Sequence, residues 1–219
     1  MSVTIESFLP FVLPSVPGCT DPAAIEAIRT AAIEFCKQTD LVQRVSTYNI
    51  VAATQDYTVT VPSDMQLARV LGAAHEGTWL ESAPPGEVES PTALTGATIG
   101  DAVLASGTPW AWFQKTPTAA TISLYPVPDT AVTLGLTIKA AFYPTQSCTV
   151  VEDVLFNEYV FTIAAGAIAR LMATPGMPFT SQLAPVYEKK FRAGTSAGNL
   201  HALHGKQTHN LRVRPRSFV

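Results

Sequence analysis

Residues Asp21–Thr39 read DPAAIEAIRTAAIEFCKQT, and this stretch decides how the helical part of the chain folds. Asp21 is expected to cap a helix, because its carboxylate accepts hydrogen bonds from backbone N–H groups of the first turn. Pro22 suits the first helical position, where no N–H is needed. One stripe of the predicted helix contains Ala24, Ile25, Ile28, Ala31, Ala32, Phe35 and Cys36. The stretch therefore predicts a half-buried helix that forms one wall of a small helical core.

Three other segments have helical patterns. Residues 5–12 are expected to form one or two turns before the prolines end them. A helix that Asp153 is expected to cap is apolar on nearly every side, so it suits the centre of a bundle or a subunit interface. Its expected core positions are Phe156, Tyr159, Val160, Ile163, Ala164, Ala167, Ile168 and Leu171. A last helix is expected from residue 181 or 182 to His201, with Leu183, Val186, Tyr187 and Phe191 on one side.

Between these helical parts, residues 41–149 change to a period of two. Tyr57, Val59 and Val61 alternate with threonines, as in a strand with one buried face. Further predicted strands are residues 67–74, 78–81, 110–114, 121–125 and 132–143, with turn-forming residues between them. Short antiparallel strands at this spacing indicate a sandwich or a small barrel. Residues 84–107 are rich in Pro, Gly, Ser, Thr and Ala and are expected to contain a long loop.

The sequence thus predicts an α+β fold, in which a small helical bundle carries an inserted antiparallel β domain and an extended C-terminal arm. The expected parts are residues 1–40 (N-terminal helices), 41–149 (β domain), 150–205 (C-terminal helices) and 206–219 (arm). In the arm, Leu211 and Val213 alternate with Arg212, Arg214 and Arg216. One face of such an arm is suited to pairing or packing on a partner.

Charge is scarce and unevenly distributed along the 219 residues. Only 14% of them are charged, against about 25% in typical globular proteins, which suggests that other chains cover much of the surface. From Tyr187 onward the chain has a local charge of +6, which leaves −9 for everything before it and −3 in total. A basic end on an acidic body is expected to meet a partner protein, a neighbouring copy or nucleic acid. A solvated, disordered end is the alternative.

Two patterns bear on catalysis and metal binding. Residues 194–198 read GTSAG, which matches the nucleophile elbow with Ser196 as nucleophile. The pattern follows a predicted helix instead of a strand, and no Asp or Glu follows Glu188, so these small residues indicate close helix packing. His201 and His204, with His209 nearby, lack acidic or thiol neighbours in the sequence and are expected to be polar surface residues.

Other chemically distinctive residues are expected to be structural. The large aromatic residues of the β part are expected to fill its core, namely Trp79, Trp110, Trp112 and Phe113. The three cysteines, Cys19, Cys36 and Cys148, share no metal spacing and are expected to be reduced. The apolar region at residues 159–173 is too short to span a bilayer, and the N-terminus makes a poor signal peptide. The sequence predicts no enzymatic activity, no cofactor or metal and no membrane partner.

Four motifs occur in a defined order along the chain. They are FLPFVLPSVPGCTDPAAIEAIRTAAIEFCKQT, a central ISLYPVPD, FNEYVFTIAAGAIARLMATPGMPF with YEKKF after it, and the closing LRVRPRSFV. Together they resemble tailed-phage head-to-tail adaptor (connector) proteins. The likeness covers roughly half of the chain and is weakest in the β part.

The resemblance implies a virion structural protein that lies in the neck between capsid and tail and is assembled in the host cytoplasm. Members of this family form a homo-oligomeric ring, usually of twelve copies, which binds the portal protein and the tail tube or nozzle. Double-stranded DNA passes through the channel of the ring without specific binding. An acidic body suits this role, because a strongly basic lining would hold the phosphates.

The resemblance also implies which residues make the contacts. The arm that docks on the portal contains Leu211, Arg212, Val213, Arg214, Arg216 and Phe218. The residues expected to form the helical core and to pack subunits are Ile25, Ile28, Phe35, Phe156, Val160, Ile163 and Leu171.

Two rival interpretations lead to different functions. A β-sandwich tail component that binds host glycans would need Trp110 and Trp112 exposed on one face. A serine hydrolase would need Ser196 as its nucleophile.

Overall fold

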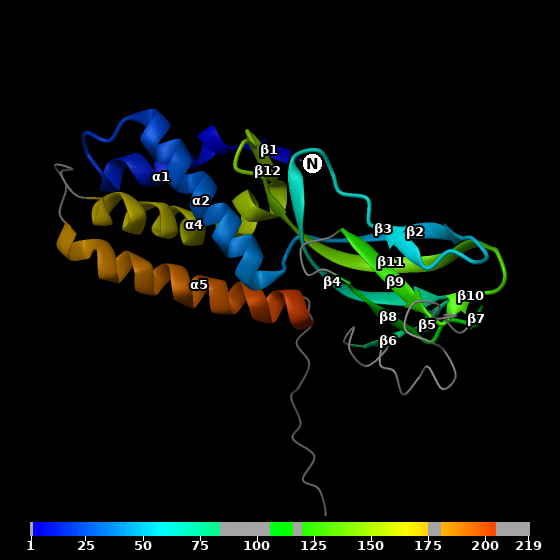
Figure 1. Ribbon diagram of the computed structural model, residues 1–219. Coiled ribbons are helices and arrows are strands. Elements are labelled where there is room, and N and C mark those ends of the chain that lie inside the picture. The colour runs from blue at the N-terminus through cyan, green and yellow to red at the C-terminus, as the bar shows by residue number, and fades with distance from the viewer. Residues whose placement is uncertain (1, 84–105, 116–119, 175–180, 205–219) are drawn as a thin grey trace, which may run out of the picture. The chain divides into compact units, whose positions relative to one another are not determined.

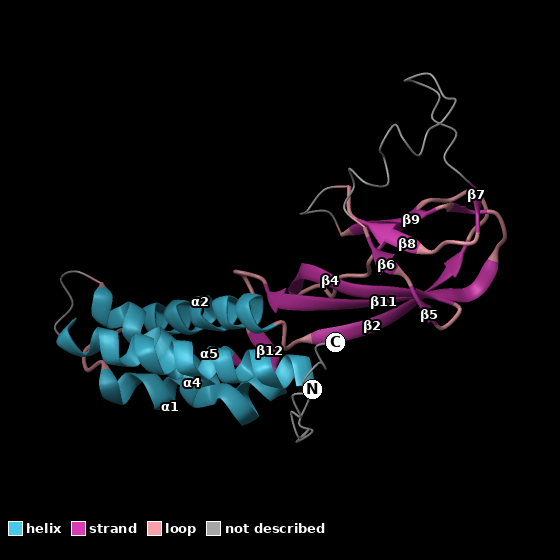
Figure 2. Cartoon of the chain, turned by 90° about the horizontal axis from the view of Figure 1, so that it is seen from below, coloured by secondary structure: helices cyan, strands magenta, loops and turns pink. Residues whose placement is uncertain are grey.

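The computed structural model describes residues 2–83, 106–115, 120–174 and 181–204, and Figure 1 shows their helices and strands. The chain divides into two units, one built from residues 1–41 and 150–219 and the other from residues 42–149. The fold is α+β, as the sequence predicts, because the first unit contains all the α-helices described and the second contains most of the strands (Figure 2).

The helical unit is assembled from both ends of the chain. Its elements are β1 (Ser2–Thr4), η1 (Ile5–Phe8), α1 (Leu9–Val12), η2 (Leu13–Ser15), α2 (Asp21–Thr39), β12 (Val150–Glu152), α4 (Asp153–Ala173), η3 (Ser181–Leu183) and α5 (Ala184–His204). Strands β1 and β12 pair antiparallel, with Val3 opposite Val151. This pairing joins the start of the chain to the segment that leads into α4, and α4 contacts α1, α2 and α5.

Helix α2 has the predicted span, but its N-terminus differs from the expectation. Thr20 is the N-cap residue and makes no side-chain capping bond, so the prediction that Asp21 caps this helix is wrong. Asp21 is instead the first helical residue, where its charge still faces the positive end of the helix dipole. The helix ends at Asp40, whose left-handed backbone (φ 49°) lets its N–H donate to the carbonyl of Cys36.

The buried face of α2 matches most of the predicted stripe. The buried residues are Ala24, Ala27, Ile28, Ala31, Ala32, Phe35, Cys36 and Thr39. Ile25, in contrast, is only half-buried. The small side chains of four alanines let this helix lie close to its neighbours, while Phe35 reaches the ring of Tyr159 on α4 at a centroid distance of 4.9 Å.

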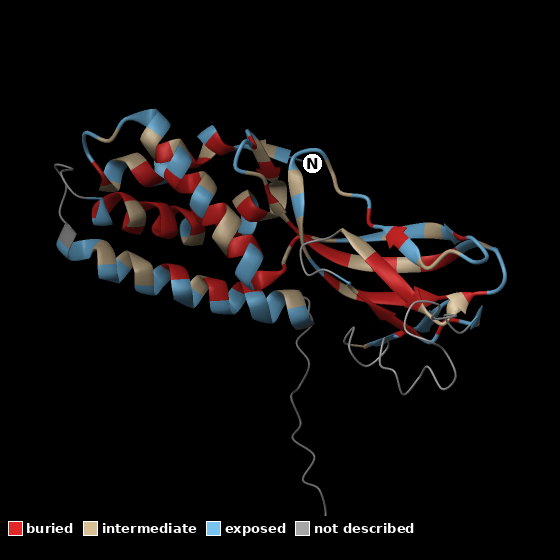
Figure 3. Ribbon diagram, viewed as in Figure 1, coloured by how far each residue is buried: buried red, intermediate tan, exposed pale blue. Residues whose placement is uncertain are grey.

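Helix α4 is the most deeply buried helix of this unit, as its red colour in Figure 3 shows. It begins at Asp153 after an N-cap Glu152 without a capping bond, so the predicted Asp153 cap is also wrong. By length and composition α4 could cross a membrane, but most of its apolar window is buried within the fold. The core helix of a water-soluble protein has the same properties, so this observation is weak evidence for a membrane.

Helix α5 buries only part of the side that apolar spacing predicts. Of the predicted residues, Phe191 is buried and Tyr187 is half-buried, whereas Leu183 and Val186 are exposed. Thr195 and Gly198, which the spacing does not mark, are buried as well. The reason is that glycines make part of the contact with the other helices, and a search for periodic apolar side chains does not identify glycine. A Cβ on Gly198 would lie 2.8 Å from Cζ of Phe35, and one on Gly194 would clash with Thr162 of α4.

The second unit contains two four-stranded sheets and one shorter pair. One sheet has the order β2 (Gln43–Ile50), β11 (Val132–Pro144), β4 (Met65–His75) and β5 (Thr78–Trp79). The other has the order β3 (Asp56–Thr58), β9 (Thr121–Tyr125), β8 (Ala111–Phe113) and β6 (Glu81–Ser82), and β7 (Ser106–Gly107) pairs with β10 (Val127–Pro128). Within the described ranges no sheet closes into a barrel.

Most of these pairings are antiparallel, as predicted, but β6 with β8 and β7 with β10 are parallel. The core of this unit includes Leu136, Ile138 and Phe142 from the long central strand β11. Residues 84–105, where the sequence predicts most of a long loop, lie outside the described residues.

Replacing Phe35 by Ala is expected to destabilise the helical unit by about 3–5 kcal/mol. Phe35 is fully buried, and its loss leaves a cavity among α2, α4 and α5 that rigid neighbours cannot fill. Phe161→Ala is the matched control, because the ring of Phe161 is 75% exposed and its removal should cost less than about 1 kcal/mol. Urea unfolding of both variants measures the difference, and equal costs would contradict this assignment of the core.

Candidate functional site

The predicted docking arm lies outside the described residues. This applies to Leu211, Arg212, Val213, Arg214, Arg216 and Phe218, so the structure bears only on the helical residues of the predicted site.

The predicted packing residues lie mainly inside their own chain. Ile28, Phe35, Val160, Ile163 and Leu171 are buried. Ile25 and Phe156 are half-buried, and the ring of Phe156 meets those of Phe8 and Phe11 edge-on, at 5.1 and 6.1 Å. Because these side chains are covered within one chain, contacts between copies would have to involve other, exposed residues.

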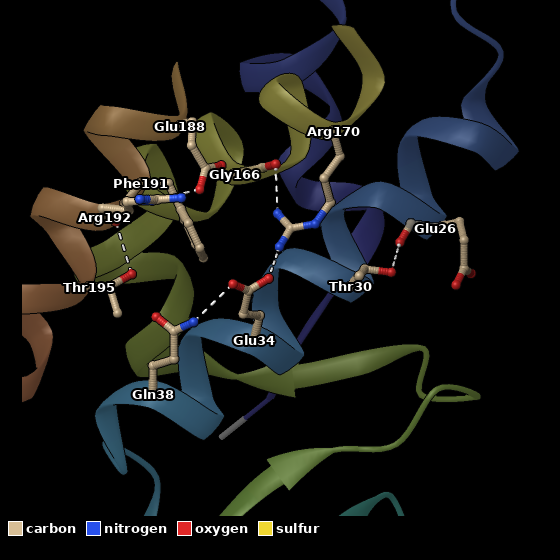
Figure 4. Close-up of polar contacts among 10 residues, drawn as sticks. All are labelled: Glu26, Thr30, Glu34, Gln38, Gly166, Arg170, Glu188, Phe191, Arg192 and Thr195. Carbon is tan, nitrogen blue, oxygen red and sulfur yellow. Dashed lines mark hydrogen bonds and ion pairs between the residues drawn. The ribbon is translucent and has the colours of Figure 1, made fainter. Parts of the chain in front are cut away.

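A polar cluster links α2, α4 and α5, and Figure 4 shows it. The guanidinium of Arg170 pairs with Glu34, donates to the carbonyl of Gly166 at 2.7 Å and lies 5.3 Å from the ring centroid of Phe191. Gln38 donates to the other oxygen of Glu34 at 2.9 Å. The cluster therefore bridges three helices with one cation that is itself only 26% exposed.

The elements of this cluster explain how one arginine reaches both neighbours. Gly166 lies one turn before Arg170 on α4, and a Cβ there would come within 2.6 Å of the Phe191 ring. The ring of Phe191 can thus come close to the backbone of α4, with the guanidinium of Arg170 over it. Arg170, Glu34 and Gln38 bind one another or the backbone of the same fold, so their role is structural. We call this set of contacts the clasp.

The serine of the GTSAG pattern lacks the setting of a nucleophile. Ser196 lies in the middle of α5 and donates to the carbonyl of Arg192 one turn earlier, at 3.0 Å. A nucleophile elbow requires a sharp turn between a strand and a helix. The expectation that these small residues mark close helix packing is confirmed by Gly194 and Gly198, which face Thr162 and Phe35.

The histidines do not form a metal site in the part of the chain that the structure describes. Nδ1 of His201 lies 2.7 Å from the hydroxyl of Tyr159, so this exposed histidine is tied to the core of the unit. His209 lies outside the described residues, as does the side chain of His204. Among described residues, no group of three His, Cys, Asp or Glu side chains is placed to hold a metal ion.

The three cysteines form no disulfide, as expected for reduced thiols, and Cys36 and Cys148 are buried. Burial, and then the nearby charge of Asp21, raises the pKa of the Cys19 thiol. A raised pKa keeps this thiol protonated and makes it a poor nucleophile at neutral pH.

The tryptophans divide into two groups. Trp112, like Phe113, is buried as predicted, whereas Trp79 and Trp110 are exposed, which corrects the expectation for these two. Trp79 lies against Gly72 of β4, and Trp110 meets Tyr125 edge-on at 5.8 Å. The glycan-binding interpretation needed Trp110 and Trp112 on one exposed face, and burial of Trp112 removes that pair.

Among the described residues of the helical unit, the most exposed aromatic one is absent from the residues that the sequence predicts to be functional. Phe161 of α4 is 75% exposed, and its ring meets only Phe11 of α1, edge-on at 5.5 Å, among the ring contacts described. Its position five residues after Phe156 places it off the buried side of α4. An apolar residue off the buried stripe of a predicted core helix is the sequence signal that could have identified it.

Comparison with known proteins adds no relative to these observations. No protein-family model matches the chain, and no curated protein sequence matches it.

Replacing Arg170 by Ala is expected to destabilise the helical unit by about 1–2 kcal/mol, because three partly buried interactions are lost together. Arg192→Ala is the matched control, since Arg192 is 77% exposed and pairs only with Glu188 of its own helix among the ion pairs described. This second change should cost no more than about 0.5 kcal/mol. Urea unfolding distinguishes the two, and a smaller loss for Arg170 than for Arg192 would show that the clasp does not join the helices.

Proposed function

We propose that this chain is a structural protein of a tailed-phage virion, which forms a ring between the portal and the tail tube or nozzle. In this role it continues the DNA channel and performs no catalysis, so it needs no cofactor or metal. The ring would consist of about twelve copies, as the family resemblance implies, located in the neck and assembled in the host cytoplasm.

The observation that carries the proposal is that α4 is apolar but only partly covered by its own chain. One side of this apolar helix is enclosed by α2 and α5, while Phe161 on another side projects into solvent. Phe161 adjoins the exposed ring of Phe11, and adjoining exposed apolar side chains are what a surface covered by another protein would carry. The low content of charged residues, at 14%, supports the same conclusion.

The order of the fold elements also supports the proposal. The two ends of the chain build the helical unit, and residues 42–149 form a separate unit between them. In finer terms, we interpret the helical unit as a small bundle, the two four-stranded sheets as a sandwich and residues 206–219 as an extended arm. This is the arrangement that the adaptor resemblance implies.

The charge distribution suits a channel protein. The chain before Tyr187 has a net charge of −9. Acidic residues along a channel would let DNA slide, because phosphates are bound mainly by Lys and Arg.

Electron microscopy of the purified full-length protein, alone and mixed with the portal ring encoded by the same genome, tests the proposal. Rings of this chain seated coaxially on the portal are the expected result. A protein that stays monomeric and never joins the portal would refute the proposed role.

The basic arm is expected to hold the ring on the portal. Deletion of residues 212–219 removes Arg212, Arg214 and Arg216, so portal attachment should be abolished while the melting temperature stays unchanged. Replacing these three arginines by lysines serves as the control for charge alone. Co-sedimentation with portal rings measures attachment, and undiminished binding of the truncated chain would contradict the docking assignment.

A further inference from the structure

The helical unit has a face built around two aromatic rings that its own chain leaves exposed. Phe11 of α1 and Phe161 of α4 contact each other and are both exposed, and we call them and Glu158 the aromatic face. Glu158 precedes Phe161 by three residues, so both lie on the same side of α4. The segments η1, α1 and η2 contain no Lys or Arg, and their only charged residue is Glu6.

A second exposed face lies on α5. Because Thr195 and Gly198 face the other helices, the opposite side of α5 is in solvent. Lys189, Ala193, Ser196 and Leu200 recur there at intervals of four, three and four residues, which places them on one stripe. We call this stripe, together with Leu203, the α5 outer face.

The composition of the α5 outer face is unusual for a helix in water. Residues 193–204 contain no Asp, Glu, Lys or Arg, although most of their side chains are exposed. Leu200 is 57% exposed and Leu203 is 69% exposed. The outer side of a surface helix normally carries charged residues, so this face is suited to being covered.

The two faces complement each other in charge and in the size of their side chains. The charged residue of the aromatic face is acidic, whereas the α5 outer face begins at Lys189, with Lys190 next to it. Arg192 pairs with Glu188 of its own helix, so these two charges offset each other. The aromatic face carries two rings, while the side chains of Ala193 and Ser196 are small and leave room beside Leu200 for a ring. Another copy of the same chain therefore carries a surface that suits each face: its α5 outer face suits the aromatic face, and its aromatic face suits the α5 outer face.

We propose that the aromatic face of one copy packs on the α5 outer face of the next copy. This inference rests on the proposed ring and names its subunit contact. The contact joins two different faces, so each added copy leaves one face of each kind free, and the series ends only when a ring closes. The occupant of both faces is therefore a second copy of this chain.

Two single substitutions test this contact in the full-length protein. Phe161→Asp alters the aromatic face and Leu200→Asp alters the α5 outer face, and both side chains are exposed, so folding should be preserved. Each variant should need at least about tenfold more protein than the wild type for half-maximal assembly in sedimentation velocity. Trp79→Asp, which alters an exposed aromatic residue of the other unit, should assemble like the wild type.

Mixing the two variants gives the decisive result. Each retains one intact face, so at the concentration where the wild type is half assembled an equimolar mixture should form one-to-one dimers and nothing larger, while either variant alone stays largely monomeric. Absence of such dimers, or an equal loss of assembly in Trp79→Asp, would overturn the pairing of these faces.

The outcomes also separate this inference from the proposed function. If both variants form rings like the wild type, the contact is wrong while the ring stands. If the wild-type protein forms no assembly at any concentration and none on portal rings, the proposed function and this contact both fail. Circular dichroism melting curves of each variant establish that lost assembly does not reflect lost folding.

Discussion

The helical unit depends on the close approach of α4 and α5. Gly166 admits the ring of Phe191, and Gly194 and Gly198 admit Thr162 and Phe35. Each glycine within a helix costs about 1 kcal/mol relative to alanine. The cost is offset by contacts that a Cβ would prevent, and these contacts set both the rotation of α5 and the position of Phe191 beneath Arg170.

This packing has a consequence for the surface of the unit. Because glycine and small side chains bring α5 against α4 on one side, the leucines of α5 point away from the core. The same arrangement leaves Phe161 outside the contacts of α4 with α2 and α5. The helical unit thus keeps apolar groups on its surface at Phe11 and Phe161 and again at Leu200 and Leu203, and the proposed head-to-tail contact between copies would cover both places.

Some elements follow from the sequence because local signals are strong. Helix α2 has its predicted span, and β9 (Thr121–Tyr125) coincides with the predicted strand. Strand β2 was not predicted, since QRVSTYNI has few apolar residues and lies at the edge of its sheet. The pairing of β1 with β12 joins residues almost 150 positions apart, which local patterns cannot reveal.

The candidate site was less accessible to sequence reasoning. The buried side of α5 follows only in part from the sequence: Phe191 is buried as expected, but periodicity counts apolar side chains and so misses the contacts that Gly194 and Gly198 make. The expected capping by Asp21 and Asp153 was wrong by one residue each, because an acid also stabilises the first turn from inside the helix. Five of the predicted packing residues are enclosed by their own chain, so a contact between copies would involve exposed residues such as Phe161 and Leu200.

The central claim is that Phe161 and Leu200 are exposed in the single chain and covered in the assembly. Hydroxyl-radical footprinting read by mass spectrometry measures this directly, by comparing oxidation of both residues in dissociated and assembled full-length protein, with Trp79 as the internal reference. The account predicts that oxidation of Phe161 and Leu200 falls together on assembly while that of Trp79 is unchanged. Undiminished oxidation of Phe161 and Leu200 in the assembled protein would contradict it.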